Sequence, residues 1–166
     1  MIFVTVGTHE QPFDRLVKYM DELKADGSIT EEIVMQTGFS TYEPKYCNWN
    51  KLYTYQDMVK NIAEARIVIT HGGPSSFIMP LQIGKIPIVV PRQKQFGEHV
   101  NNHQVEFAKS VAKRQGNIIV VEKISELRQT ILNYETIIGA MPAGLKSNNL
   151  SFNEKLEEIV REMFRK

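Results

Sequence analysis

Short apolar segments alternate with amphipathic segments along the chain. The apolar segments are rich in β-branched residues, as buried parallel strands require, and the amphipathic ones repeat their apolar side chains at helical spacing. We predict strands at residues 2–6, 33–36, 67–69, 88–90 and 118–121, and a further short strand at 51–55. We predict helices at residues 12–24, 55–65, 99–114, 124–132 and about 151–165, and one that begins at Pro74. Residues 39–50 and 135–149 show no clear period and are predicted to be loops.

This alternation predicts the fold class. Parallel strands need crossover connections, usually helices, so the chain is expected to form an α/β fold with one doubly wound, Rossmann-like parallel sheet. A length of 166 residues with 42% hydrophobic and 23% charged residues suits one soluble domain, which we place at residues 1–166. Residues 142–151 are the only segment that reads as a linker.

The amino-acid composition limits the binding partners and the cellular compartment that we expect. A formal net charge of +1 gives no bulk attraction to nucleic acid, so none is expected as a partner. The single cysteine, Cys47, rules out an internal disulfide, fits a reducing compartment and reads as a plain half-buried thiol. No apolar run is long enough to span a membrane, and residues 1–10 lack the basic start of a signal peptide. We expect a cytoplasmic protein that reaches a membrane only through a partner or a surface patch.

Polar residues gather after two consecutive predicted strands, at residues 70–76 and 97–104. In open α/β sheets, ligands bind outside the carboxyl ends of the strands. The glycine turns at Gly7–Thr8 and Gly72–Gly73 each lead towards a helix, whose free N–H groups can bind phosphate. With Ser75 and Ser76 they suggest a cradle for a diphosphate. Neither turn matches the dinucleotide fingerprint or the P-loop, which argues against a nicotinamide enzyme and a standard NTPase.

All four histidines follow predicted strands or begin the next helix, which collects them on one edge of the sheet: His9, His71, His99 and His103. One loop histidine can simply fill a corner, but four on one edge favour a site. His99 and His103 are four residues apart and lack an obvious third ligand, so we expect no metal and no cofactor.

Several of these residues have both a binding and a structural interpretation. Glu98 could accept hydrogen bonds from sugar or ribose hydroxyls, or could simply complement the dipole at a helix start. Arg92 could pair with phosphate, or could be a solvated surface charge. His103 and Gln104 could hydrogen-bond a sugar.

At these residues the chain resembles a known family, the C-terminal, donor-binding domain of glycosyltransferase family 28, which has the GT-B fold. It is also similar to the small donor-binding subunits of split transferases. These include bacterial capsule and exopolysaccharide proteins and the soluble subunit of the dolichol-linked N-acetylglucosaminyltransferase. The matching segments are residues 3–8, 13–17, 70–78, 84–92 and 97–104.

The resemblance implies that the chain binds a nucleotide sugar, usually a UDP-sugar, and assigns roles to residues. Gly7 and Thr8 would line the diphosphate. The central phosphate loop would consist of His71, Gly72, Gly73, Ser75 and Ser76. The sugar or ribose would meet Glu98, His99, Asn102, His103 and Gln104. Many relatives hold the ribose with a carboxylate at the position of Met79, so here Glu98 or another arrangement would have to serve.

The resemblance also implies a reaction and a partner. The chain has no room for the acceptor-binding half of a GT-B enzyme, so a membrane-associated subunit is implied to supply it. Together they would form an inverting hexosyltransferase acting on a lipid-linked acceptor in capsule or exopolysaccharide synthesis. His9 is the in-chain candidate for the general base, which could instead lie on the partner.

Two alternatives stay open at this point. The chain could be a non-catalytic enhancer or stabiliser of a membrane glycosyltransferase. The aromatic residues of the long loop could form a face for that partner or a small satellite core: Tyr42, Tyr46, Trp49 and Tyr53.

Overall fold

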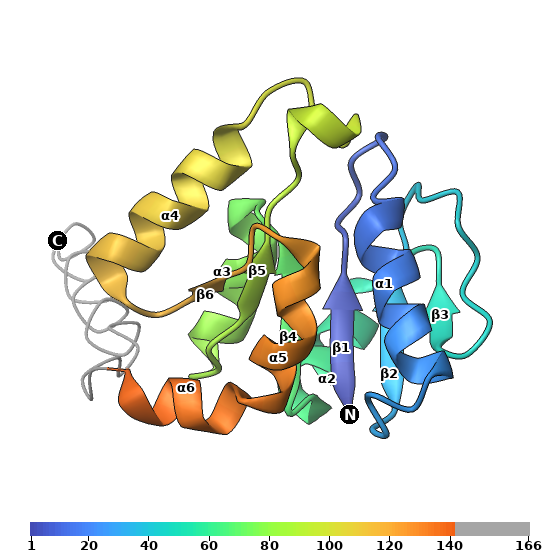
Figure 1. Cartoon of the computed structure of the whole chain (residues 1–166), viewed down its shortest axis with the longest axis horizontal. Helices are drawn as coiled ribbons and strands as arrows, with labels where there is room; N and C mark the ends of the chain where they lie inside the picture. Colours follow the sequence, from blue (N-terminus) through green and yellow to red (C-terminus); the bar gives the residue numbers. More distant parts are fainter. Residues whose placement is uncertain (142–166) are drawn as a thin grey trace, which may run out of the picture.

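A computed structural model describes residues 1–141 and contains one parallel six-stranded sheet in that range, with strand order β3-β2-β1-β4-β5-β6 (Figure 1). The strands are β1 (Ile2–Thr5), β2 (Ile33–Gln36), β3 (Asn48–Asn50), β4 (Ile67–His71), β5 (Ile88–Val90) and β6 (Ile119–Val120). The chain enters the sheet at its centre, builds outwards to β3 and then crosses back to β4. The sheet confirms the predicted doubly wound α/β fold.

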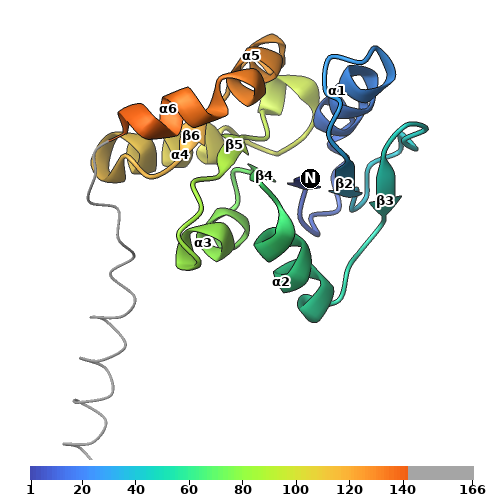
Figure 2. The same ribbon diagram turned by 90° about the horizontal axis from the view of Figure 1, so that it is seen from below.

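Helices cover both faces of this sheet, with α2 and α3 on one face and α1 and α5 on the other (Figure 2). The helices are α1 (Asp14–Ala25), α2 (Tyr55–Glu64), α3 (Pro74–Gln82), α4 (His103–Gln115), α5 (Leu127–Leu132) and α6 (Tyr134–Ala140). Two short 3₁₀ turns, η1 (Lys94–Phe96) and η2 (Ile124–Glu126), precede α4 and α5. None of the helices within residues 1–141 is long and apolar enough to cross a membrane.

Strand β1 shows how the sequence pattern builds the core. Its side chains alternate between the two faces, so Val4 packs in the cluster that contains Leu16 of α1, while Phe3 packs with Ile62 of α2. Because both faces of the strand are covered by helices, every residue of β1 is buried. The central strands therefore hold the loops at their carboxyl ends in fixed positions.

The structure corrects three sequence predictions. The short strand expected at 51–55 is β3, at Asn48–Asn50, and its residues are all exposed. It pairs with β2 through its backbone at the edge of the sheet, so it has no apolar pattern to detect. Part of the predicted loop at 135–149 is helix α6, which begins at the buried residue Tyr134. Helix α4 begins at His103 instead of residue 99. The predicted linker at 142–151 and helix at about 151–165 lie outside the described residues.

The loop between β2 and β3 is organised around the buried carboxylate of Asp21. It accepts hydrogen bonds from the N–H groups of Lys45, Tyr46 and Cys47 at 2.8–3.1 Å and from the Tyr42 hydroxyl at 2.9 Å. Burial alone would raise the pKa of Asp21, but these donors outweigh it and lower the pKa. Tyr42 thus packs against the main core beside α1 rather than in a separate satellite core, whereas Tyr46 remains 61% exposed.

We expect Asp21→Asn to lower the free energy of unfolding by about 2 kcal/mol. The amide has one acceptor oxygen instead of two, and its NH₂ group would face the N–H donors that the carboxylate now binds. Urea unfolding measures the change. Asp26→Asn is the matched control, since Asp26 is exposed and accepts from Ser28 alone. Equal effects of the two substitutions would contradict this role of Asp21.

Candidate functional site

His71, the last residue of β4, lies between two glycines at the carboxyl edge of the sheet. A Cβ atom at Gly7 would be 2.3 Å from its Nε2 atom, and a Cβ atom at Gly73 would be 2.2 Å from its Cε1 atom. Both distances are far below van der Waals contact, so the ring can occupy this space only because both neighbours lack a side chain. We call His71, Gly7 and Gly73 the histidine cradle.

The hydrogen bonds of His71 define its protonation state. The Gly73 N–H group donates to Nδ1 at 3.0 Å, so in the neutral ring the proton is on Nε2, which donates to the Ser76 hydroxyl at 2.9 Å. Burial, followed by the positive charge of Arg92, lowers the pKa of His71 to about 4. At neutral pH the ring is therefore uncharged and fixes the positions of the glycine turn and of Ser76.

This lowered pKa predicts a loss of stability in acid. Because the folded-state pKa of about 4 lies below the ordinary value of 6.5, the unfolded chain binds the proton more tightly. The contribution of the neutral His71 ring to the free energy of unfolding is complete above about pH 6.5. Roughly 3 kcal/mol of it is lost as the pH falls to about 4. The difference in unfolding free energy between the wild type and His71→Gln should shrink over this range. The His71 ring resonances should not titrate between about pH 7 and 5. Titration near pH 6.5 would contradict the burial argument.

A pocket of about 370 Å³ opens beside the histidine cradle. It lies at the carboxyl ends of β1, β2 and β4 and at the first turn of α3, where no side chain caps the N–H groups. Its lining residues are Thr5, Gly7, Thr8, His9, Gln36, Tyr53, Tyr55, Met58, His71, Ser75 and Ser76. Free N–H groups at a helix start, glycines and hydroxyls are the groups that bind phosphate oxygens.

One side of this pocket comes from residues that the sequence prediction did not include. The Gln36 amide donates to Thr5 Oγ1 at 3.2 Å and its oxygen accepts from the Tyr53 N–H group at 3.1 Å. Tyr55, at the start of α2, is 76% exposed. The signal available in the sequence was Gln36 itself, a polar residue that ends an apolar strand.

Arg92 does not have the position expected for a phosphate ligand. Its side chain is fully buried, and its two terminal nitrogens donate to the carbonyl oxygens of Val6, Gln11, Pro12 and Glu98 at 2.7–3.3 Å. Burial lowers the pKa of Arg92 to about 10, so it remains charged at neutral pH. It joins the loop after β1 to the loop after β5, beneath the site.

Glu98 is also turned inwards. It is 2% exposed and forms a two-pronged ion pair with Arg15 of α1, with N–O distances of 2.7 and 2.9 Å, and accepts from the Gln93 N–H group at 3.0 Å. Its carboxylate is therefore occupied by protein donors and does not face a sugar. Arg15 is a site-forming residue that the sequence reasoning missed, because its partner lies 83 positions away.

The remaining candidates are divided between the edges of the site. The Gln104 amide oxygen accepts from the N–H groups of Gly72 and Arg92 at 3.0 and 3.1 Å and so joins the loops after β4 and β5. The rings of His9 and His99 lie together, with centroids 5.2 Å apart. His103 is exposed and, with Gln104 and Phe107, lines an apolar pocket of about 580 Å³ next to Gly72. Asn102 lines a third pocket, described below.

Two further features concern the ribose and metals. Met79, which replaces the carboxylate expected from the resemblance, packs in the cluster of Phe3 and Ile62 under the sheet. Among residues 1–141, no group of three or more His, Cys, Asp or Glu side chains is arranged to hold a metal ion.

A doubly wound parallel sheet with a glycine-lined pocket at the carboxyl ends of its strands is the arrangement of Rossmann-like ligand-binding domains. The family model of the glycosyltransferase family 28 C-terminal domain matches residues 1–158, and the chain belongs to this family. The family resemblance seen in the sequence is thereby confirmed.

Relatives are found among eukaryotic proteins. The human UDP-N-acetylglucosamine transferase subunit ALG13 is 34% identical over 121 residues, which cover 68% of this chain and 10% of the human protein. The protein of the same name from Yarrowia lipolytica is 28% identical over 131 residues, which cover 69% of this chain and 62% of that protein. The chain thus matches about a tenth of the human relative and less than two thirds of the yeast one.

A solved structure supports the fold. The glycotransferase of kitacinnamycin superposes with a TM-score of 0.50 and 15% identity, over 83% of this chain and 37% of that one. At this level of identity the likeness concerns the chain fold alone.

Proposed function

We propose that the chain is the UDP-sugar-binding subunit of a two-component inverting glycosyltransferase. The observation that carries this proposal is the histidine cradle beside the uncapped first turn of α3, within a glycosyltransferase family 28 domain. The Ser75 N–H group and the hydroxyls of Ser75 and Ser76 would bind the diphosphate. Pro74 has no N–H group, and those of Gly72, Gly73 and Ser76 donate within the protein. Gly7 and Thr8 would contact it from the loop after β1.

The nucleoside would occupy the side of the pocket formed by Gln36, Tyr53 and Tyr55. The Gln36 amide, which donates to Thr5 and accepts from Tyr53, has a second N–H group that it can donate to the edge of a base. The exposed ring of Tyr55 offers a face on which a base can stack. The sugar would extend towards His99, in the loop after β5, and towards His103 and Gln104 at the start of α4. Asn102, expected from the sequence to meet the sugar, instead lines the third pocket, where its Oδ1 atom accepts from the Lys94 N–H group. In this arrangement Arg92 and Glu98 act as positioning residues, because their side chains hold the two loops together from below.

The reaction would proceed by attack of an acceptor hydroxyl on the anomeric carbon. The bond to the diphosphate oxygen breaks, UDP leaves with the electron pair, and a base takes the proton of the hydroxyl. The dipole of α3 would stabilise the negative charge that develops on UDP.

The hydrogen bond of His9 limits its use as the base. Its Nδ1 atom accepts from the Gln11 N–H group at 3.2 Å, so the neutral ring has its proton on Nε2 and its lone pair in use. Burial, then the positive charge of Arg92, lowers the pKa of His9, which favours its neutral form. His9 could act as the base only after the bond to Gln11 opens, and we therefore propose a base on the partner subunit.

The partner we propose is a membrane-associated subunit that binds a lipid-linked acceptor and holds this chain at the cytoplasmic face of the membrane. The relatives are named as transferase subunits, which supports a divided enzyme. The transferred unit would be a hexose, in polysaccharide synthesis of the capsule or exopolysaccharide type. UDP-N-acetylglucosamine, the donor in the relatives' names, is the first to test, followed by the UDP forms of glucose, galactose and glucuronate.

Reconstitution tests this function. The chain and its membrane subunit are purified separately and together, and transfer of radiolabelled sugar from each UDP-sugar to a lipid-linked acceptor is measured. We expect transfer only when both subunits are present. Full transfer by the membrane subunit alone, with no change in its KM for UDP-sugar when this chain is added, would show instead an enhancer or a stabiliser.

A further inference from the structure

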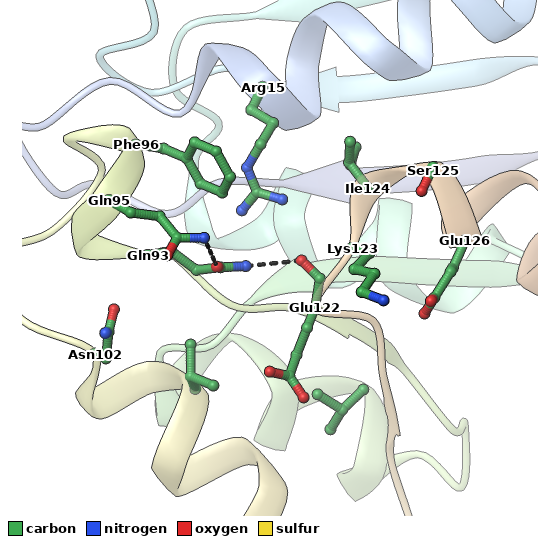
Figure 3. Close-up of a pocket in the computed structure, with 12 residues that line it drawn as sticks. Arg15, Gln93, Gln95, Phe96, Asn102, Glu122, Lys123, Ile124, Ser125 and Glu126 are labelled. Atoms are coloured by element: carbon green, nitrogen blue, oxygen red, sulfur yellow. Dashed lines mark hydrogen bonds between the residues drawn. The ribbon is translucent and has the colours of Figure 1, made fainter.

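The third pocket, which is polar and has a volume of about 710 Å³, lies between the loops that follow β5 and β6 (Figure 3). Its volume is in the range of small-molecule sites, roughly 300–1,000 Å³. Figure 3 shows Arg15 reaching in from α1 towards Phe96 on one side, with the segment from Lys123 to Glu126 on the other. None of the residues that line it also lines the pocket beside the histidine cradle.

The lining of this pocket is rich in hydrogen-bonding side chains. Eight of the twelve residues are polar: Arg15, Gln93, Gln95, Asn102, Glu122, Lys123, Ser125 and Glu126. Several of these groups are held in place by the protein. The Gln93 amide donates to the Glu122 carbonyl at 2.7 Å, the Gln95 amide donates to Gln93 Oε1 at 2.9 Å, and Asn102 Oδ1 accepts from the Lys94 N–H group at 2.9 Å.

The same side chains leave hydrogen-bonding groups free. Arg15 uses Nε and Nη2 for Glu98 and the Pro91 carbonyl, whereas its buried Nη1 atom has no hydrogen-bond partner within residues 1–141. In the same range, the side chains of Ser125 and Glu126 make no hydrogen bond. A buried donor without a partner is costly, so a ligand oxygen at Arg15 Nη1 would be favourable.

The charges of the pocket select the class of ligand. Arg15 is paired with Glu98, and Glu122 with Lys109 at 2.8 Å. Lys123 and Glu126 then contribute one charge of each sign, so neither an anion nor a cation meets a surplus of opposite charge. Phe96 adds a ring that is 53% exposed. Amides, carboxylates and a hydroxyl around an aromatic ring suit a neutral ligand with many hydroxyl groups, which both donate and accept hydrogen bonds.

We infer that this pocket binds a neutral saccharide and is separate from the site for the nucleotide sugar. Hydroxyl groups of the saccharide would accept from Arg15 Nη1 and donate to the carboxylate of Glu126 and the free oxygen of Gln95. An apolar face of a sugar ring would lie near Phe96.

Chemical-shift mapping on the full chain tests this inference. Cellobiose, lactose and N,N′-diacetylchitobiose are each added at about 10 mM. A site with a Kd of about 1 mM, equivalent to a binding free energy of about −4.1 kcal/mol, would be mostly occupied at this concentration. We expect at least one of them to shift the side-chain amide signals of Gln95 and Asn102. If none shifts them, the inference is wrong.

A matched pair of substitutions locates the site. Ser125→Trp fills the pocket from an exposed position on η2, and Gln129→Trp places the same side chain at an exposed position of α5 that does not line the pocket. Ser125→Trp should weaken saccharide binding at least about tenfold, whereas Gln129→Trp should not change it. Neither should alter UDP binding. Equal loss in both variants, or loss of UDP binding in Ser125→Trp, would overturn the assignment of a separate saccharide pocket.

Discussion

Replacing Arg92 with methionine is expected to lower the free energy of unfolding by about 3 kcal/mol. The substitution leaves the carbonyl oxygens of Val6, Gln11, Pro12 and Glu98 without their donor, at roughly 1 kcal/mol each. Removal of a buried charge whose Nε atom has no partner in the described residues offsets part of this loss. Urea unfolding at neutral pH measures the difference.

Two further variants make this prediction specific to the geometry of Arg92. Arg92→Lys keeps the charge but cannot reach all four carbonyls, so its loss of stability should be smaller than that of Arg92→Met. Arg128→Met changes an exposed arginine on α5 and should stay within about 0.5 kcal/mol of the wild type. If Arg92→Met unfolds at the same urea concentration as Arg128→Met, Arg92 is not the link between the two loops.

Gly73→Ala is expected to reduce the affinity for UDP at least about tenfold, equivalent to about 1.4 kcal/mol. The backbone at Gly73, with φ −74° and ψ 129°, suits alanine, so the effect arises from the new methyl group alone. That group would stand 2.2 Å from the His71 ring, which Gly7 confines on the other side. The ring and the first turn of α3 would have to move apart. Calorimetric titration with UDP measures the loss.

Gly139→Ala is the control for this substitution. Gly139 lies in α6, where an added Cβ meets no atom within 4 Å, so UDP binding should be unchanged. Thermal unfolding of Gly73→Ala confirms that the variant is folded at the temperature of the titration. Normal UDP affinity in folded Gly73→Ala would mean that the histidine cradle does not form the phosphate site.

The sequence predicted the parts of the molecule that depend on local pattern. Strands such as β2 and β4 are buried on both faces and appear as short apolar runs, and glycines directly after a strand mark the loops at its carboxyl end. The position of His71 at this edge therefore followed from the sequence. The tight fit of its ring between Gly7 and Gly73 did not, because these glycines lie far apart in the chain.

The roles of Arg92 and Glu98 could not be predicted for a related reason. Each was considered as a surface charge or a ligand contact, because the partners that bury them come from α1 and from the loop after β1. Strand β3 was misplaced because an exposed edge strand is fixed by backbone pairing to β2, which leaves no pattern in its side chains. Such long-range partners are visible only in the folded chain.

The central claim is that the histidine cradle and the first turn of α3 bind the diphosphate of a UDP-sugar. Calorimetric titration of the full chain with UDP and with UDP-N-acetylglucosamine, alone and in complex with its membrane subunit, tests this most directly. We expect saturable binding of UDP that Gly73→Ala weakens and Gly139→Ala leaves intact. Absence of binding by UDP and by every UDP-sugar, with and without the membrane subunit, would contradict it.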